Sequence, residues 1–235
     1  MKRNLLFIPT LNEAGSIHDL VTNVLKENPY LNVLVIDDNS IDGTTEIIKN
    51  LMMNYHNLFL IVRPRKLGVG SAHIEALNFA KRNNYEFLVT MDADGSHNPK
   101  YIGDFLSTID CCDLVIGSRY KNPESLLEWH FHRKLLTYVV HFLTTILLGL
   151  SYDCSSGFRC YRVNSIPEIV FTGLKSTGYD FFFESVYEIT RAKLKIQEIS
   201  ITLPARTYGS SKLTYKLAVK AFVTLVTLCT SRIKR

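Results

Sequence analysis

The first hundred residues alternate between short apolar runs and longer segments in which apolar residues recur every three or four positions. A short apolar run bounded by polar residues indicates a buried strand, whereas apolar residues at helical spacing indicate an amphipathic helix. This part of the chain is therefore predicted to alternate strands with helices. The expected strands are 5–9, 33–36, 58–62 and 86–91, and the expected helices are 14–25, 42–51 and 68–82.

This order is typical of an α/β fold with a mostly parallel central sheet, helices on both faces and right-handed crossovers. A further strand is expected at 114–118, after which the regular alternation ends. The remaining chain is predicted to form a smaller lobe. Its expected parts are an apolar helix at 135–150, a loop with Gly and Ser at 154–159, a helix at 181–192 and a strand at 194–203.

Ligands of such sheets bind at the carboxyl edge of the strands. The loops that leave this edge are predicted at 9–13, 37–42, 63–70 and 92–99. The last of them begins with Asp92 and Asp94, directly after an apolar run. Two carboxylates this close repel each other unless a hard divalent cation or a hydrogen-bond network holds them. A cation site and an ordinary turn or helix cap are both compatible with the pair.

The strand at 33–36 also ends in acids, Asp37 and Asp38. Carboxylates there can accept hydrogen bonds from a ribose or a base, and they can also cap the helix that follows. Both roles stay open.

Gly68 and Gly70 resemble part of a dinucleotide fingerprint, but His73 stands where its third glycine belongs. A NAD-dependent reductase is therefore disfavoured. We interpret the two glycines as a tight turn that lets the backbone approach a nucleotide. The candidate phosphate or base contacts beside this turn are Arg63, Arg65 and Lys66.

The chain has 235 residues and a net charge of +5, and from Arg206 onward it carries seven basic residues and no acidic one. This size suits one sizeable domain, and the basic end favours an anionic surface rather than nucleic acid. The apolar stretches 135–150 and 217–229 are shorter than the roughly 20 residues that span a bilayer, so they are expected to lie in the membrane interface or in the core. Five cysteines without a Cys-x-x-Cys pair and a short amino-terminal apolar run indicate a cytosolic protein.

Four segments, 9–13, 35–44, 63–68 and 91–99, resemble in order and spacing the family-2 inverting glycosyltransferases of GT-A fold. Among these, the dolichol-phosphate or polyprenol-phosphate mannose synthases are the most similar group. Segments 117–120, 156–159 and 206–212 extend the resemblance over nearly the whole chain.

The resemblance implies one glycosyltransferase domain over 1–235, in which 1–120 bind the sugar nucleotide and 121–235 face the acceptor and the membrane interface. It implies residue roles by motif. The nucleotide-sugar pocket would include Pro9, Glu13, Asp38, Lys66 and Asp92, and the metal, Mg²⁺ or Mn²⁺, would be held by Asp92 and Asp94. The acceptor phosphate would be bound by Arg119, Arg133, Arg206 and Lys212, with Asp94, Arg119 and Arg206 as the catalytic residues.

Two positions depart from the family pattern. Ser96 stands where related synthases often have Gln, so water or His97 is expected to complete the metal shell there. Phe182 replaces a Gln in the segment that leads to Glu184, so a polar contact is lost at that position.

A phosphate acceptor also agrees with the residue chemistry, because a phosphate monoester is already anionic and needs positioned cations more than a general base. The second lobe offers arginines, Arg159 among them, and Glu184 as its one family-like carboxylate. The Gln-x-x-Arg-Trp segment of processive polysaccharide synthases is absent, which disfavours a polymerising enzyme.

The expected function is inverting transfer of a hexose, with mannose from GDP-mannose favoured, to a polyprenyl or dolichyl phosphate at the cytosolic membrane face. A separate membrane subunit is left open as a partner. One alternative is transfer from another sugar nucleotide, such as UDP-glucose or a UDP-N-acetylhexosamine, to a saccharide or lipid in surface-polysaccharide synthesis. The other alternative is a non-catalytic subunit that only binds a sugar nucleotide.

Overall fold

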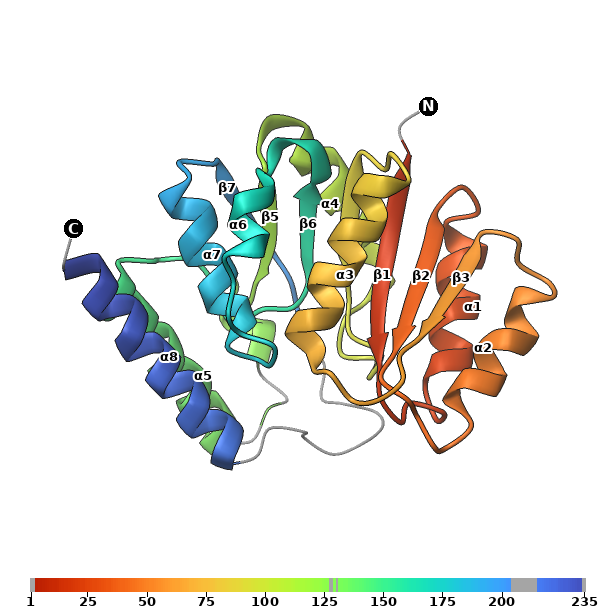
Figure 1. Ribbon diagram of the computed structural model, residues 1–235, viewed down its shortest axis with the longest axis horizontal. Helices are drawn as coiled ribbons and strands as arrows, with labels where there is room; N and C mark the ends of the chain where they lie inside the picture. Colours follow the sequence, from red (N-terminus) through yellow and green to blue (C-terminus); the bar gives the residue numbers. More distant parts are fainter. Residues whose placement is uncertain (1–2, 127–128, 130, 204–214, 234–235) are drawn as a thin grey trace.

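A computed structural model of the protein describes residues 3–126, 129, 131–203 and 215–233. In this part of the chain, seven strands form one sheet in the order β3-β2-β1-β4-β6-β5-β7 (Figure 1). The strands are β1 (Asn4–Thr10), β2 (Asn32–Asp37), β3 (Leu58–Val62), β4 (Phe87–Thr90), β5 (Leu114–Ser118), β6 (Arg159–Arg162) and β7 (Ile196–Ser200). The α-helices are α1 (Ile17–Glu27), α2 (Thr44–Met52), α3 (Val69–Arg82), α4 (Ile102–Thr108), α5 (Phe131–Leu143), α6 (Glu168–Thr172), α7 (Phe181–Arg191) and α8 (Tyr215–Ile233).

The predicted α/β fold with a mostly parallel sheet is confirmed. Strands β1 to β4 pair in parallel, as do β5 and β7, whereas β6 runs antiparallel to both of its neighbours, β4 and β5. The prediction of a loop at 154–159 was wrong at its end, because Arg159 begins β6. With two arginines in four residues, this strand shows neither an apolar run nor a clean alternation.

Both faces of the sheet are buried, which explains the near-continuous apolar runs of its strands. Alternate residues of β1 point to opposite faces, so that Leu6 and Ile8 join one core and Leu5 and Phe7 the other. The first core includes residues of α1 and α4, and the second includes residues of α3, α6 and α7. Figure 1 shows α3, α6 and α7 together over one face of the sheet.

Helices α5 and α8 both lie at the end of the molecule far from β3 (Figure 1). A π-helical turn, Thr144–Leu148, continues α5 and contacts α8. Leu225 and Leu228 of α8 are buried in the second core. Outward-facing apolar side chains remain on both helices: Phe131, Leu135, Leu136, Tyr138, Val139 and Phe142 on α5, and Val219, Phe222, Val223 and Val226 on α8. Among the described residues, no helix is both long enough and apolar enough to cross a bilayer.

Candidate active site at the carboxyl edge of the sheet

The first acid of the β2 edge, Asp37, is completely buried and holds two loops together. Its carboxylate accepts hydrogen bonds from Thr10 Oγ1 at 2.7 Å and from Ser40, through the backbone amide at 2.8 Å and Oγ at 2.6 Å. These bonds join the end of β1 to the loop that follows β2. Asp37 therefore shapes the edge of the sheet with contacts to its own chain.

The second acid, Asp38, contacts the turn that opens α3. Its Oδ2 accepts a hydrogen bond from the Gly68 amide at 3.0 Å, and its carboxylate is paired with the buried guanidinium of Arg63. Arg63 also donates to Ser71 Oγ at 2.7 Å and to the Gly68 carbonyl at 3.1 Å. Arg63 was a candidate for contacting phosphate or base, but the structure turns it inward to hold Asp38 and the Gly68 turn.

Gly68 and Gly70 permit a close approach of the protein's own chain, and the approach of a nucleotide to this turn stays a prediction. Gly68 has φ +97°, and a Cβ there would collide with the carbonyl oxygen of Thr177. A Cβ on Gly70 would lie 2.6 Å from Cβ of Phe181, and the Gly70 amide donates to the Thr177 carbonyl at 2.9 Å. The turn that begins α3 is thus packed directly against the segment that leads into α7.

The loops after β1 and β2 are locked to each other by short polar contacts. Asn12, at φ 55°, donates its amide to Ser40 Oγ at 2.8 Å, and the Glu13 amide donates to Thr44 Oγ1 at 2.9 Å. Asp42 accepts from the Ala14 amide at 2.9 Å and from Thr44; burial opposes ionisation, but these hydrogen bonds lower the pKa of Asp42. The predicted nucleotide contacts Pro9 and Glu13 are half-buried on this loop, and Lys66 is exposed on the loop after β3. Their contact with a sugar nucleotide stays a prediction.

Asp92 and Asp94 follow β4 and keep part of their surface open. The Asp92 side chain is 37% exposed, and the Asp94 side chain is half-buried. Asp94 Oδ1 accepts from the Ser96 amide at 3.0 Å and from Ser96 Oγ at 2.6 Å, so the serine fixes this carboxylate. A Cβ on Gly157 would lie 3.4 Å from Asp92 Oδ1, so the glycine leaves room beside that carboxylate.

His97 is buried beside the acid pair, with its ring stacked on Phe158 at 4.7 Å between centroids. Its Nδ1 accepts a hydrogen bond from the Asp92 amide at 2.9 Å, and its Nε2 lies 4.0 Å from Asp92 Oδ2. In a neutral ring the proton is then on Nε2, which makes that nitrogen a donor toward Asp92 rather than a metal ligand. His97 thus orients Asp92.

The acid pair fits a hard divalent cation. Carboxylate oxygens are the ligands that Mg²⁺ and Mn²⁺ prefer, and Mg²⁺ in particular is commonly held by one or two carboxylates together with substrate phosphates and water. Among the described residues, no group of three or more His, Cys, Asp and Glu side chains is placed to bind a metal. A cation at Asp92 and Asp94 would therefore complete its shell with oxygens from outside these side chains.

Arg119 follows β5 and lies at the same edge of the sheet as the acid pair, because β4 and β5 both run antiparallel to β6. Its guanidinium is 9% exposed and makes a two-point contact with fully buried Asp153, Nε to Oδ2 at 2.8 Å and Nη2 to Oδ1 at 2.6 Å. Burial disfavours the charged guanidinium, but Asp153 and, more weakly, Asp92 raise the pKa of Arg119. The same guanidinium lowers the pKa of Asp153 against the effect of burial. Arg119 is thus a rigidly held cation within electrostatic reach of Asp92.

Two other charged residues of the second lobe have structural contacts. Arg159 is fully buried and donates to Ser185 Oγ at 2.9 Å and to the carbonyls of Cys154, Ser156 and Phe182. It therefore cannot meet an acceptor, which corrects its place among the predicted phosphate-binding cations. Both carboxylate oxygens of Glu184 accept backbone amides, from Lys175 at 3.1 Å and Ser176 at 2.9 Å.

Three predicted acceptor contacts are not placed by the structure. Arg206 and Lys212 lie outside the described residues, and so does the side chain of Arg133, whose backbone belongs to α5.

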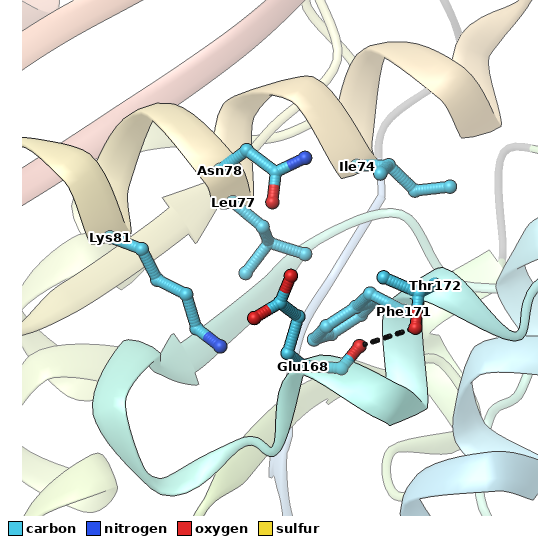
Figure 2. A pocket seen from close by; sticks show the side chains of 7 residues that line it. All are labelled: Ile74, Leu77, Asn78, Lys81, Glu168, Phe171 and Thr172. Atoms are coloured by element: carbon cyan, nitrogen blue, oxygen red, sulfur yellow. Dashed lines mark hydrogen bonds between the residues drawn. The ribbon is translucent and has the colours of Figure 1, made fainter.

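A separate hollow lies between α3 and α6, away from the carboxyl edge. Figure 2 shows Leu77 and Phe171 pointing into it, with Lys81 and Glu168 at its sides. Lys81 Nζ donates to the Ile166 carbonyl at 2.9 Å. This mostly apolar recess includes no residue of the loops at the carboxyl edge and is not a candidate for the sugar nucleotide.

Comparison with known proteins agrees with this arrangement. The sequence pattern of Glycosyl transferase family 2 matches residues 6–170, which include both acid pairs and Arg119. The chain belongs to this family. A named relative of this family-2 glycosyltransferase is the undecaprenyl-phosphate mannosyltransferase of Micrococcus luteus, 32% identical over 94% of this chain and 91% of the relative. Another is the polyprenol monophosphomannose synthase of Mycolicibacterium smegmatis, 32% identical over 90% of this chain and 81% of the relative.

Solved structures support the GT-A fold of this family-2 glycosyltransferase. Glucosyl-3-phosphoglycerate synthase from Mycobacterium tuberculosis in complex with phosphoglyceric acid superposes with a TM-score of 0.71 at 15% identity, over 97% of this chain and 80% of that chain. The same synthase in complex with Mn²⁺, UDP and glucosyl-3-phosphoglycerate gives a TM-score of 0.68 at 16% identity, over the same shares of the two chains.

Sequence reasoning missed Asp153, the partner of Arg119. The two residues are 34 positions apart, and the short segment around Asp153 has no feature that distinguishes it from a surface loop.

Proposed function

We propose that this protein transfers a mannosyl group, with inversion, from GDP-mannose to the phosphate of a polyprenyl or dolichyl phosphate at the cytosolic membrane face. The observation that carries the proposal is the placement of Arg119 at the same edge of the sheet as the acid pair, with its guanidinium held by Asp153 at 2.8 and 2.6 Å. The two mannosyl-transferring relatives, each matched over more than four fifths of its length, support the sugar and the lipid phosphate.

In the proposed reaction, an oxygen of the lipid phosphate attacks the anomeric carbon while the bond from that carbon to the diphosphate oxygen breaks. The products are a mannosyl phospholipid and GDP. The acceptor is already anionic, so no residue has to remove a proton from it. Asp92 and Asp94 would hold Mg²⁺ or Mn²⁺, which supplies neutralisation of charge on the departing diphosphate. Arg119 would align the lipid phosphate, with Asp153 fixing the plane of its guanidinium.

The outward apolar residues of α5 and α8 support a lipid surface as the place of reaction. Phe142 and Phe222 are more than half exposed, and Lys220 on α8 is exposed as well. Apolar side chains next to basic ones are suited to a membrane interface with anionic lipids. By resemblance, Arg133, Arg206 and Lys212 would complete the cations around the acceptor phosphate.

A transfer assay tests donor and acceptor together. The purified protein is incubated with Mn²⁺ or Mg²⁺, labelled GDP-mannose and undecaprenyl phosphate in vesicles, and the lipid product is separated by chromatography. We expect label in a mannosyl phospholipid, none with undecaprenol that lacks the phosphate, and loss of transfer with EDTA. Transfer from UDP-glucose or UDP-N-acetylglucosamine instead would overturn the donor. Absence of transfer from every donor, together with retained nucleotide binding, would favour a non-catalytic subunit.

A further inference from the structure

The carboxylate of Asp180 contacts a helix that is not its own. Asp180 stands at the amino-terminal cap position of α7, yet its side chain makes no capping hydrogen bond to that helix. It is 3% exposed, and its Oδ2 accepts from Thr224 Oγ1 of α8 at 3.1 Å and lies 3.5 Å from Lys220 Nζ of the same helix. An aspartate at this position ordinarily accepts an amide of the first helical turn. Here the carboxylate is directed to α8.

The other oxygen of Asp180 holds the segment 176–178, which packs against the turn at Gly68–Gly70. Asp180 Oδ1 accepts the Gly178 amide at 3.2 Å. One residue earlier, the Thr177 carbonyl accepts the Gly70 amide at 2.9 Å and fills the space that a Cβ on Gly68 would need. Gly68 in turn donates its amide to Asp38. A series of side-chain and backbone contacts thus runs from α8 through Asp180 and residues 177–178 to the turn beside Asp38.

This contact is rigid, because the atoms nearest to the Cβ positions of the two glycines are backbone atoms and the Cβ of Phe181 rather than the ends of flexible side chains. The carbonyls of Ser176 and Gly178 each lie 3.0 Å from the Cβ position of Gly70. Glu184 holds the same segment from behind through the amides of Lys175 and Ser176. A shift of residues 176–178 therefore has to move the turn at Gly68–Gly70 as well.

We propose that Asp180 is a positioning residue that ties α8 to the turn at Gly68–Gly70. The position of α8 then sets the geometry of this turn, on the side of the site proposed to bind the sugar nucleotide. The outer face of α8 carries Phe222 and Val223, whereas Thr224 lies on the side toward Asp180. The helix proposed to meet the lipid is thereby joined to the loop proposed to meet the sugar nucleotide. This inference rests on the proposed function for its kinetic consequence, but not for its structural one.

The structural test is hydrogen–deuterium exchange on the full chain without any donor. We expect the substitutions Asp180→Asn and Thr224→Val each to speed amide exchange in residues 68–71 and 176–178 by about threefold to tenfold, the effect of one lost hydrogen bond. Thr227→Val is the matched control, because Thr227 Oγ1 bonds only within α8, to the Val223 carbonyl at 2.9 Å. Unchanged exchange in both test variants, or equal acceleration by Thr227→Val, would overturn the inference. If Asp180→Asn fails to fold, Thr224→Val still tests the same contact, because it leaves Asp180 unchanged.

The kinetic test separates positioning from a loss of folded protein. Asp180→Asn and Thr224→Val are expected to raise the KM for GDP-mannose by about threefold to tenfold with kcat within about twofold of the starting protein. A merely structural role would lower kcat through a smaller folded fraction and leave KM unchanged, which would also overturn the inference. If the unmodified protein does not use GDP-mannose at all, the proposed function fails while the exchange measurement still decides the role of Asp180.

Discussion

Two pairs of aspartates end strands of the same sheet, and the structure gives them opposite environments. Asp37 is the last residue of β2 and Asp38 follows it; both are buried, with their oxygens bonded to Thr10, Ser40 and Gly68 of the protein itself. Asp92 and Asp94 follow β4 and stay partly exposed. The first pair builds the edge of the sheet, and the second pair is presented by it. A carboxylate at the carboxyl edge is thus not by itself a ligand for a substrate or a metal.

The difference arises from the residues that follow each pair. After β2, Ser40 turns its amide and hydroxyl back onto Asp37, and Thr10 reaches it from the adjacent strand β1. After β4, Ser96 orients one oxygen of Asp94, and His97 accepts the Asp92 amide while its Nε2 stays 4.0 Å from Asp92 Oδ2. The carboxylates of Asp92 and Asp94 are thus oriented by neighbouring residues but are not buried by them.

The largest effect is expected from Asp94→Ala. Removing this carboxylate should reduce the rate of mannosyl transfer by about a thousandfold or more, because charge on the leaving diphosphate would lose its metal anchor. Since Asp94 is only half-buried, the melting temperature should change by no more than a few degrees. Rates from the lipid-product assay and a thermal unfolding curve on the same sample check both parts. A near-normal rate would show that Asp94 does not hold the metal.

The next largest effect is expected from Asp37→Ala, and it should fall on stability. The substitution leaves the hydroxyls of Thr10 and Ser40 and the Ser40 amide without their acceptor, at a cost of about 3 kcal/mol in the free energy of unfolding. Urea unfolding measures this value, with Asp94→Ala as the control that should lose much less. Equal losses in the two variants would abolish the distinction between the pairs.

The sequence predicted the fold and the positions of both acid pairs, because these depend on local apolar runs and on the rule that parallel strands end at one edge. It could not distinguish the pairs, because burial of Asp37 depends on Thr10, which is 27 residues away. The same limit explains Arg159, which resembles one more surface cation in the sequence but is enclosed by three carbonyls, two from the loop before β6 and one from α7. Contacts between distant segments decided each case that the pattern left open.

A third prediction concerns the dependence of stability on pH. Acid that destabilises the whole fold would act on both aspartate pairs and would hide the difference between them. Burial lowers the pKa of His73 from 6.5 to about 3, and its ring packs edge-on against Phe7 and Phe182. At a pH between these two pKa values, the unfolded chain binds a proton at His73 that the folded protein excludes. The contribution of His73 to the free energy of unfolding is therefore fully present above pH 6.5 and is lost as the pH falls below it. We expect this residue to lower the free energy of unfolding by about 2 kcal/mol from pH 7 to pH 5.

His73→Phe should remove that loss, because a phenyl ring suits the surrounding aromatic side chains and cannot be protonated. Urea unfolding of both proteins at pH 7 and pH 5 measures the change. If the variant loses as much stability as the starting protein over this range, another group is responsible for the acid sensitivity.

The smallest effects come from the serines that orient each pair, and they provide the most direct comparison. Ser96→Ala removes one of two hydrogen bonds to Asp94 Oδ1 and should lower kcat by about fivefold, with little change in stability. Ser40→Ala removes the corresponding bond to Asp37 and should instead lower the free energy of unfolding by about 1 kcal/mol, with kcat nearly unchanged. The two substitutions delete the same atom next to the same kind of group, and Ser40→Ala also removes the acceptor of the Asn12 amide, which adds to its loss of stability. If Ser40→Ala slows transfer as much as Ser96→Ala does, then the buried pair also acts on the substrate, and burial alone does not separate the residues that build this edge from those that use it.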